Sequence, residues 1–337
     1  GFSKTCSSRL MRPIVQAGKP ILLHIRADAE RRLRAGHPWL YERAILRQSR
    51  VGLPGELAVI YDRRNRFLAI GLYDPLSPLR VRVLQRYKPV PIDGRWFHAR
   101  LSEAVRRRAA LHGVDTTGYR LVHGENDGLP GLVLDRYEDT LVLKLYTAAW
   151  AAHLPQVQAA VREVWPFRRL VLRLSRAVQA QDPSASGLQD GAILAGPALR
   201  RAVVFLEHGL RFEVDPIRGQ KTGFFLDQRD NRARVERMAR GAAVLDAFAY
   251  TGAFSVHAAR GGAKIVLSLD ASHPALQAAA RNMALNRHLP GIAAVSHELL
   301  AGDVFAQLSR LRRQRRVFEL VILDPPAFAT TAAQVPN

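Results

Sequence analysis

Two apolar runs flank a glycine turn and a helix-forming stretch between Val244 and Ser272, a segment that reads VLDAFAYTGAFSVHAARGGAKIVLSLDAS. An apolar run opens the segment, helix-forming residues fill Ala253–Arg260, and a second apolar, β-branched run covers Ile265–Leu269. The pattern predicts a strand, a tight turn, a helix and a second strand. Gly252 lies in the turn, where the lack of a side chain would let the backbone approach a ligand. Such a unit is typical of adenosine-binding α/β sheets.

The flanking segments predict that residues 213–337 form a doubly wound, Rossmann-like sheet. Before the central unit, a helix is expected over Gln228–Met238, with Asp227 as its N-terminal cap. After it, the expected elements are a helix over Pro274–Asn286, a weak strand over Ile292–Val295, a helix over Val304–Leu311 and a buried strand over Phe318–Leu323. Alternating strands and helices favour a parallel sheet.

The N-terminal quarter has a different pattern. Residues 1–20 predict a disordered tail, and residues 21–90 predict short strands separated by Gly, Pro and Asn turns, with an early helix near Asp28–Ala35. Strands at this spacing favour a small β-barrel. Arg80 and Arg82 share one face of the last strand, where they would either contact RNA phosphates or form a solvated face.

Residues 91–212 predict an α+β middle domain. Its expected elements are helices over Trp96–His112 and Ala151–Val164, a hairpin over Leu132–Tyr146, a strand over Arg169–Leu174, a loop over 181–198 and a hairpin over Val203–Val214. Glu125 and Asp127 resemble a catalytic carboxylate pair, but their place in a loop rich in glycine favours a role in holding a tight turn.

Charge changes this picture more than overall composition does. The chain carries 50 Lys and Arg against 29 Asp and Glu, a net charge of +21, and over half of the excess lies in residues 1–90. A field of this sign favours nucleic acid as a partner. No apolar run is long enough for a membrane helix, so no membrane partner is expected. A single cysteine, Cys6, excludes internal disulfides and a Cys-based zinc site, and fits a cytoplasmic location.

Three carboxylates, Asp246, Asp270 and Asp303, fall at or just after predicted strand ends, which meet at one edge of such a sheet. Asp270 suits ribose hydroxyls, Asp303 suits an adenine amino group, and Asp246 suits the ammonium of an amino-acid tail. S-adenosylmethionine has all three groups. NAD is disfavoured, because the turn at Tyr250 lacks a G-x-G-x-x-G pattern and three carboxylates would repel a diphosphate.

Two further stretches predict parts of the same site. The polar loop Gly219–Gly223 precedes the central unit and could close over a ligand. Asp324, Pro325 and Pro326 end the last predicted strand, where two prolines fix the backbone so that its acceptors face a substrate base. Phe328 could stack on that base, which would have to leave an RNA stack first.

Two resemblances sharpen these predictions. The string from Leu23 through GHPWLY, LPGELAVIYD and FLAIGLYDPLSPLRVRVL resembles a PUA domain, an RNA-binding barrel. With YRLVHGENDGLPGLVLDRY, GQKTGFFLDQRDNR, LDAFAYTGAFSVHAARGGA, NMALN and DPPAF, the chain resembles the PUA-containing class I rRNA large-subunit methyltransferases. The resemblance implies an S-adenosylmethionine-dependent enzyme acting on ribosomal RNA, with cytosine C5 as target atom.

Carried onto this chain, the resemblance assigns residues to two sites. The cofactor site falls on Gln220, Lys221, Thr222, Asp246, Phe248, Tyr250, Gly252, Asp270 and Asp303. The base-facing motif falls on Asp324, Pro325, Pro326 and Phe328.

One feature of the family has no counterpart in this sequence. Methylation at cytosine C5 needs a cysteine that adds at C6, and in the family it lies on a later strand. The sequence ends at Asn337, so we expect a C-terminally truncated sheet that stops after its fourth strand, weak or no binding of the donor, and no 5-methylcytosine product. Val317–Leu323 would then be an uncovered apolar edge, and pairing of this edge between two chains would form a homodimer. The alternatives are a non-catalytic RNA-binding protein and an RNA base N-methyltransferase.

Overall fold

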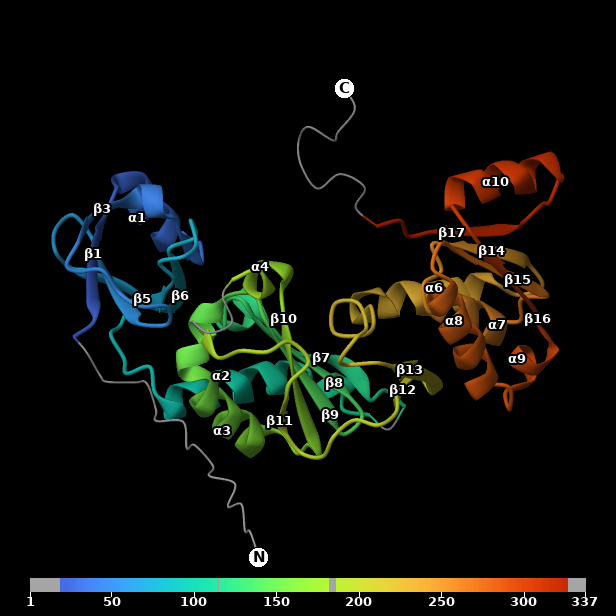
Figure 1. Ribbon diagram of the computed structural model, residues 1–337, viewed down its shortest axis with the longest axis horizontal. Helices are drawn as coiled ribbons and strands as arrows, with labels where there is room; N and C mark the ends of the chain where they lie inside the picture. Colours follow the sequence, from blue (N-terminus) through green and yellow to red (C-terminus); the bar gives the residue numbers. More distant parts are fainter. Residues whose placement is uncertain (1–18, 114, 182–185, 327–337) are drawn as a thin grey trace, which may run out of the picture.

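The computed structural model describes residues 19–113, 115–181 and 186–326, and Figure 1 shows three sheet-containing bodies that follow one another along the chain. Cys6, Ala327 and Phe328 lie outside the described residues. None of the described helices is both long and apolar enough to span a bilayer.

The N-terminal body is a curved six-stranded sheet with the order β2-β6-β5-β4-β1-β3. Its elements are β1 (Ile21–Ile25), α1 (Ala27–Arg34), β2 (Trp39–Leu40), η1 (Glu42–Ala44), β3 (Ile45–Gln48), β4 (Leu57–Tyr61), β5 (Phe67–Tyr73) and β6 (Val81–Arg86). Strands β1 and β4 direct alternate apolar residues into one core, as period-two alternation requires, whereas β5 is buried along nearly its whole length. The sheet curls around that core in Figure 1, which agrees with the predicted small barrel.

The middle body is a five-stranded sheet with the order β11-β10-β9-β8-β7. Its elements are α2 (Gly94–Arg107), η2 (Ala109–Leu111), β7 (Gly118–His123), η3 (Gly124–Asp127), β8 (Leu132–Tyr137), β9 (Thr140–Leu145), η4 (Ala148–His153), α3 (Leu154–Val164), β10 (Arg169–Leu174), α4 (Arg176–Gln179) and β11 (Ile193–Ala195). Helices α2 and α3 pack on each other and cover one face of this sheet. The prediction of a loop over residues 181–198 was wrong in one respect, because this segment contains the edge strand β11.

The C-terminal body is an all-parallel sheet with the order β16-β15-β14-β17. A hairpin of β12 (Val203–Glu207) and β13 (Leu210–Val214) precedes it. Its elements are η5 (Leu226–Gln228), α6 (Arg229–Met238), β14 (Ala243–Ala247), α7 (Ala253–Arg260), β15 (Ile265–Asp270), α8 (His273–Leu285), α9 (Pro290–Ala294), β16 (Ser296–Ala301), α10 (Val304–Arg313) and β17 (Leu320–Leu323). The predicted strand, turn, helix and strand over Val244–Ser272 are confirmed as β14, α7 and β15.

Three local predictions were wrong. The weak strand over Ile292–Val295 is helix α9, because Pro290 has the backbone geometry of a first helical turn, and the strand β16 follows it. Asp227 does not cap α6; its carboxylate instead lies 3.6 Å from the Lys221 ammonium. The strand expected to be buried, β17, is a short edge strand in which only Ile322 is buried.

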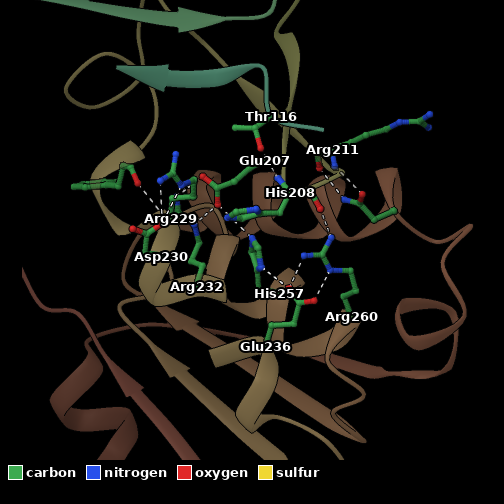
Figure 2. Close-up of polar contacts among 12 residues, drawn as sticks. Thr116, Glu207, His208, Arg211, Arg229, Asp230, Arg232, Glu236, His257 and Arg260 are labelled. Atoms are coloured by element: carbon green, nitrogen blue, oxygen red, sulfur yellow. Dashed lines mark hydrogen bonds and ion pairs between the residues drawn. The ribbon is translucent and has the colours of Figure 1, made fainter. Parts of the chain in front are cut away.

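One apolar core joins the middle and C-terminal bodies. It contains Tyr137 and Val142 from the middle sheet, Phe205 and Phe212 from the hairpin, and Phe224 from the chain that enters α6. Beside it lies a buried polar cluster on the hairpin, α6 and α7, shown in Figure 2. The hairpin therefore fixes the C-terminal sheet against the middle sheet. The boundary placed at residue 212 remains a prediction.

Candidate functional site

The parallel register brings the predicted site to one edge of the C-terminal sheet. Ala247 pairs with Leu269 on one side and with Leu323 on the other, so β14, β15 and β17 end level with one another. Asp270 is the last residue of β15, and Asp324 follows β17 directly. The predicted carboxylates therefore gather where ligands bind in open α/β sheets.

Asp270 organises the turn after β14. Its Oδ2 accepts a hydrogen bond from the Tyr250 amide at 2.8 Å, and its Oδ1 accepts one from the Ser272 amide at 2.8 Å. The turn contains left-handed backbone at Phe248 (φ 64°) and Tyr250 (φ 48°), which costs L-residues about 1 kcal/mol or more each. Because Asp270 holds the Tyr250 amide, it stabilises this conformation and keeps free lone pairs for a ligand.

Gly252 has a different role from the one expected. Its φ is 71°, and a Cβ at this position would lie 2.6 Å from the Cβ of Ala279 in α8. The missing side chain therefore lets the start of α7 approach α8, and it is a packing requirement of the fold. Approach of a ligand is not needed to explain this glycine.

Asp246 is buried inside the sheet, with 1% of its surface exposed. Its Oδ2 accepts a hydrogen bond from Ser255 Oγ at 2.6 Å, and Ser255 is linked through Ser268 to the Nε2 atom of His297. Burial, with smaller contributions from the nearby Asp324 and Asp270 carboxylates, raises the pKa of Asp246 to about 7. Sequence reasoning missed Ser255, Ser268 and His297 as partners, because they come from three separate elements.

Replacing Asp246 by asparagine should change how stability depends on pH. In the wild type, the pKa of Asp246 is higher in the folded than in the unfolded state. The contribution of Asp246 to stability is therefore complete below pH 3.8 and is lost as the pH rises through about 7. The asparagine side-chain amide would still accept the Ser255 hydrogen bond without a charge to bury. In urea denaturation, we expect the free energy of unfolding of the variant to rise by about 1–3 kcal/mol relative to that of the wild type as the pH is raised from about 5 to about 8. A difference that stays constant over this range would contradict the assignment.

The remaining carboxylates are accessible. Asp303 is exposed and caps α10 by accepting a hydrogen bond from the Ala306 amide at 2.9 Å, which leaves one carboxylate oxygen available. Asp324, Pro325 and Pro326 are exposed at the end of β17. Phe328 lies outside the described residues, so its predicted stacking role stays a prediction.

The polar loop 215–223 contacts the turn and the middle sheet together. The Gln220 amide donates to Tyr250 Oη at 3.3 Å, and the Lys221 ammonium lies over the Phe225 ring at 4.2 Å. Thr222 differs from the prediction: it is 1% exposed, and its hydroxyl donates to Asp135 Oδ2 at 2.6 Å. The Thr222 side chain therefore faces the middle sheet, whereas the contact from Gln220 to the turn comes from its backbone N–H.

The predicted RNA-contacting face of Arg80 and Arg82 was wrong. Both side chains are buried, with 9% and 8% of their surface exposed. Arg80 pairs with Glu42, and Arg82 lies 3.7 Å from Asp74 and packs against Gly131 of the middle body. Strand alternation could not show that the middle body covers Arg82, or that Arg80, just before β6, is buried within the N-terminal body.

A cationic pocket on the N-terminal body lies between α1 and the chain around β2. Its lining includes Arg26, Arg32, His37, Tyr41 and Arg43. The Arg43 guanidinium lies 5.9 Å from the Tyr41 ring centroid. Among the described residues, Arg32 and Arg43 have no carboxylate partner, so their charge is available. The excess of arginine over acid in residues 21–50 was the signal for this surface.

The structural interpretation of Asp127 is confirmed. Its Oδ2 accepts a hydrogen bond from the His123 amide at 2.6 Å, and it forms an ion pair with Arg108 at 2.8 Å. Glu125 accepts a hydrogen bond from Trp39 Nε1 at 3.0 Å and so joins the middle body to the N-terminal sheet. Within the described ranges, no group of three or more His, Cys, Asp or Glu side chains is placed to hold a metal ion.

Comparison with known families matches two parts of the chain. Residues 188–335 match the S-adenosylmethionine-dependent methyltransferase family, and residues 23–86 match a PUA-like domain. The first match contains the C-terminal sheet with the turn and loop described above, and the second contains the N-terminal sheet.

Individual relatives match most of the chain. It is 51% identical to a ribosomal RNA large subunit methyltransferase of Deinococcus radiodurans, over 93% of this chain and 76% of that protein. It is 35% identical to ribosomal RNA large subunit methyltransferase I of Pseudoalteromonas translucida, over 93% of this chain and 78% of that protein. Among solved structures, SMU.776 complexed with SAH aligns with a TM-score of 0.79 and 27% identity, covering 91% of this chain and 77% of that one.

Proposed function

Because this chain belongs to the S-adenosylmethionine-dependent ribosomal RNA large subunit methyltransferases, we propose that it transfers a methyl group to a base of large-subunit ribosomal RNA. The observation that carries the proposal is the gathering of Asp270, Asp303 and Asp324 at the carboxyl edge of the sheet, within the part that matches the methyltransferase family. An RNA substrate would place the protein in the cytoplasm.

The described residues fit S-adenosylmethionine better than a dinucleotide. Asp270 would accept hydrogen bonds from the ribose hydroxyls, and the free oxygen of Asp303 would accept one from the adenine amino group. Buried Asp246 would attract the ammonium of the tail through its field, not by contact. The same negative field disfavours a diphosphate. The bound donor would supply an electrophilic methyl group on a sulfonium.

Asp324 and the two prolines after it would orient the base. The exposed carboxylate and carbonyl groups are acceptors, and the prolines lock φ so that they keep one direction. A cytosine offers an exocyclic amino group to such acceptors. The resemblance names cytosine C5 as target, but that atom needs a thiol for attack at C6, and Cys6 is the sole cysteine in this sequence. Digestion of the methylated rRNA identifies the target atom: 5-methylcytosine would support the C5 target, and a methyl group on another atom would contradict it.

Titration calorimetry of the 337-residue chain tests the proposal. We expect saturable binding of S-adenosylmethionine and, separately, of a large-subunit rRNA fragment. Asp270 and Asp303 keep carboxylate lone pairs for a ligand at the edge of the sheet, so we expect donor binding to be measurable, although the sequence suggested weak or no binding. Binding of RNA alone would favour the non-catalytic alternative. With both ligands bound, a methylated purine or exocyclic nitrogen in the digested RNA would favour the N-methyltransferase alternative.

The cationic pocket on the N-terminal body should contribute to RNA binding. Replacing both Arg32 and Arg43 by glutamine removes two charges available to phosphates. We expect about a tenfold loss of RNA affinity near 0.1 M salt, with the slope of log K against log salt falling by about 2. Arg281→Gln removes an exposed arginine outside the pocket, already paired with Glu213, and should change affinity little. Equal losses of RNA affinity in the double variant and in Arg281→Gln would show that the pocket is not a specific contact site for RNA.

A further inference from the structure

The 215–223 loop is a compact turn. Asp215 accepts hydrogen bonds from the Ile217 and Arg218 amides through its carboxylate, both at 2.9 Å, and from the Gly219 amide through its carbonyl. Gly223 has φ 123°, and a Cβ there would lie 2.1 Å from a methyl group of Val214. These contacts give the loop a defined shape, but they do not fix its position relative to the turn at Tyr250.

Three neighbouring strands of the middle sheet fix that position. Arg173 on β10 donates from Nη1 to the Pro216 carbonyl at 3.1 Å and to the Gly219 carbonyl at 3.0 Å. Lys144 on β9 pairs in register with Arg173 and donates to the Lys221 carbonyl at 3.0 Å. Polar side chains in adjacent strands thus hold the backbone of the loop along most of its length.

The fourth contact is a buried hydroxyl. Thr222 Oγ1 donates to Asp135 Oδ2 at 2.6 Å and accepts from Tyr137 Oη at 3.0 Å. Asp135 on β8 is fully buried and is held by Arg120 through two hydrogen bonds of 2.8 and 3.1 Å. A buried carboxylate with a charged partner on one side makes strong hydrogen bonds, so it anchors Thr222 firmly.

On its other side the loop reaches the turn that we assign to the donor. The Gln220 amide contacts Tyr250 Oη, and Tyr250 is the residue whose amide Asp270 holds. The middle sheet, the loop, Tyr250 and Asp270 therefore form one continuous chain of hydrogen bonds. These contacts hold the loop in one position beside the turn, so it does not need to close when a ligand binds.

We propose that Asp135, Lys144 and Arg173 of the middle sheet are positioning residues for the methyl donor, because they hold the 215–223 loop against the Tyr250 turn. The inference rests on the proposed function, since it needs the turn to be the donor site. It extends the donor site to the middle sheet, where these three residues lie outside the matched methyltransferase part. Donor affinity then depends on side chains that do not touch the donor.

The test compares variants that release the loop with matched controls. Thr222→Val removes the hydroxyl with little change of shape, and Arg173→Met removes the guanidinium. Thr222→Ser keeps the hydroxyl. Thr140→Val removes another fully buried threonine hydroxyl of the middle sheet, which accepts from Arg169 at 3.0 Å and does not contact the loop. Two quantities are measured: the Kd for S-adenosylmethionine, and the rate of tryptic cleavage after Lys221, which is exposed.

For Thr222→Val we expect a Kd about tenfold higher and cleavage about tenfold faster, as the loss of one charge-assisted hydrogen bond implies. For Arg173→Met, which loses two such bonds to the loop, we expect effects at least as large. Thr140→Val should stay close to the wild type in both measurements, and Thr222→Ser should recover most of what Thr222→Val loses. Unchanged cleavage would show that these residues do not hold the 215–223 loop in place. Faster cleavage with unchanged Kd would overturn the positioning role and leave the proposed function intact. Absence of saturable donor binding to the wild type would instead overturn the donor site. The cleavage rates would still show whether the middle sheet holds the 215–223 loop.

Discussion

Replacing Arg232 by methionine lowers the free energy of unfolding by about 3–5 kcal/mol, the cost of leaving a buried partner charge uncompensated. Arg232 is 1% exposed, and its Nε and Nη2 atoms donate to the two oxygens of Glu207, each at 2.6 Å. Glu207 is fully buried at the end of β12. Methionine fills a similar volume, so the expected loss comes from the missing charge and hydrogen bonds.

The surroundings of this pair explain the size of the effect. Figure 2 shows His257 between Glu207 and Glu236, with hydrogen bonds of 3.2 and 2.8 Å, while Arg260 pairs with Glu236. Burial alone would raise the pKa of Glu207, but hydrogen bonds from His257 and Arg232 outweigh it and lower that pKa to about 2. The stabilisation is therefore present above pH 4.5 and is lost as pH falls through about 2.

Urea denaturation followed by circular dichroism measures the effect. Arg281→Met is the matched control, because Arg281 forms an exposed pair with Glu213 and should cost less than about 1 kcal/mol. Adding Glu207→Gln to Arg232→Met removes the stranded charge, so the double variant should be more stable than the sum of the two single effects predicts. Additive losses would mean that Glu207 and Arg232 do not act as a pair.

Replacing Asp270 by alanine lowers donor affinity by about 100-fold, since it removes charge-assisted hydrogen bonds worth about 1.5–3 kcal/mol each. We assign two functions to this carboxylate. It accepts the Tyr250 and Ser272 amides, which fixes the turn, and its remaining lone pairs face the ribose. Alanine loses both functions at once, so the effect should exceed that of any variant of the 215–223 loop.

Calorimetric titration at a temperature where circular dichroism shows the variant folded measures this loss. Asp230→Ala provides the control, because Asp230 is an exposed aspartate at the start of α6 that pairs with its neighbour Arg229. We expect its affinity for the donor to stay within about twofold of the wild type. A similar affinity for Asp270→Ala and Asp230→Ala would remove Asp270 from the site.

Much of the fold follows from local pattern. The pattern in Val244–Ser272 predicts β14, α7 and β15, because the glycine turns and the apolar runs are all local signals. The failure at Ile292–Val295 has a local cause too: Pro290 favours a helical start, but the apolar residues after it suggested a strand. The shortness and exposure of β17 depend on its place at the edge of the sheet, which a local pattern does not contain.

The site divides in the same way. Asp270 could be placed at a strand end from spacing alone, because parallel strands bring their carboxyl ends to one edge. Asp303 also lies at that edge, but it follows β16, whereas the sequence placed the strand at Ile292–Val295. The burial of Arg82 and Thr222 could not be predicted from the sequence, because the residues of the middle body that cover them are far away in the chain. The polar cluster of Figure 2 joins residues from 207 to 260, and no spacing in that range pointed to it.

The assignment of a methyl-donor site to the β14–β15 turn and its carboxylates underlies both the proposed methyl transfer and the positioning role of the middle sheet. Equilibrium dialysis of the 337-residue chain against radiolabelled S-adenosylmethionine measures donor binding without depending on the RNA substrate. We predict saturable binding of about one donor per chain, displaced by S-adenosylhomocysteine, unaffected by NAD and lost in Asp270→Ala. Absence of saturable binding, displacement by NAD, or full binding by Asp270→Ala would contradict the assignment.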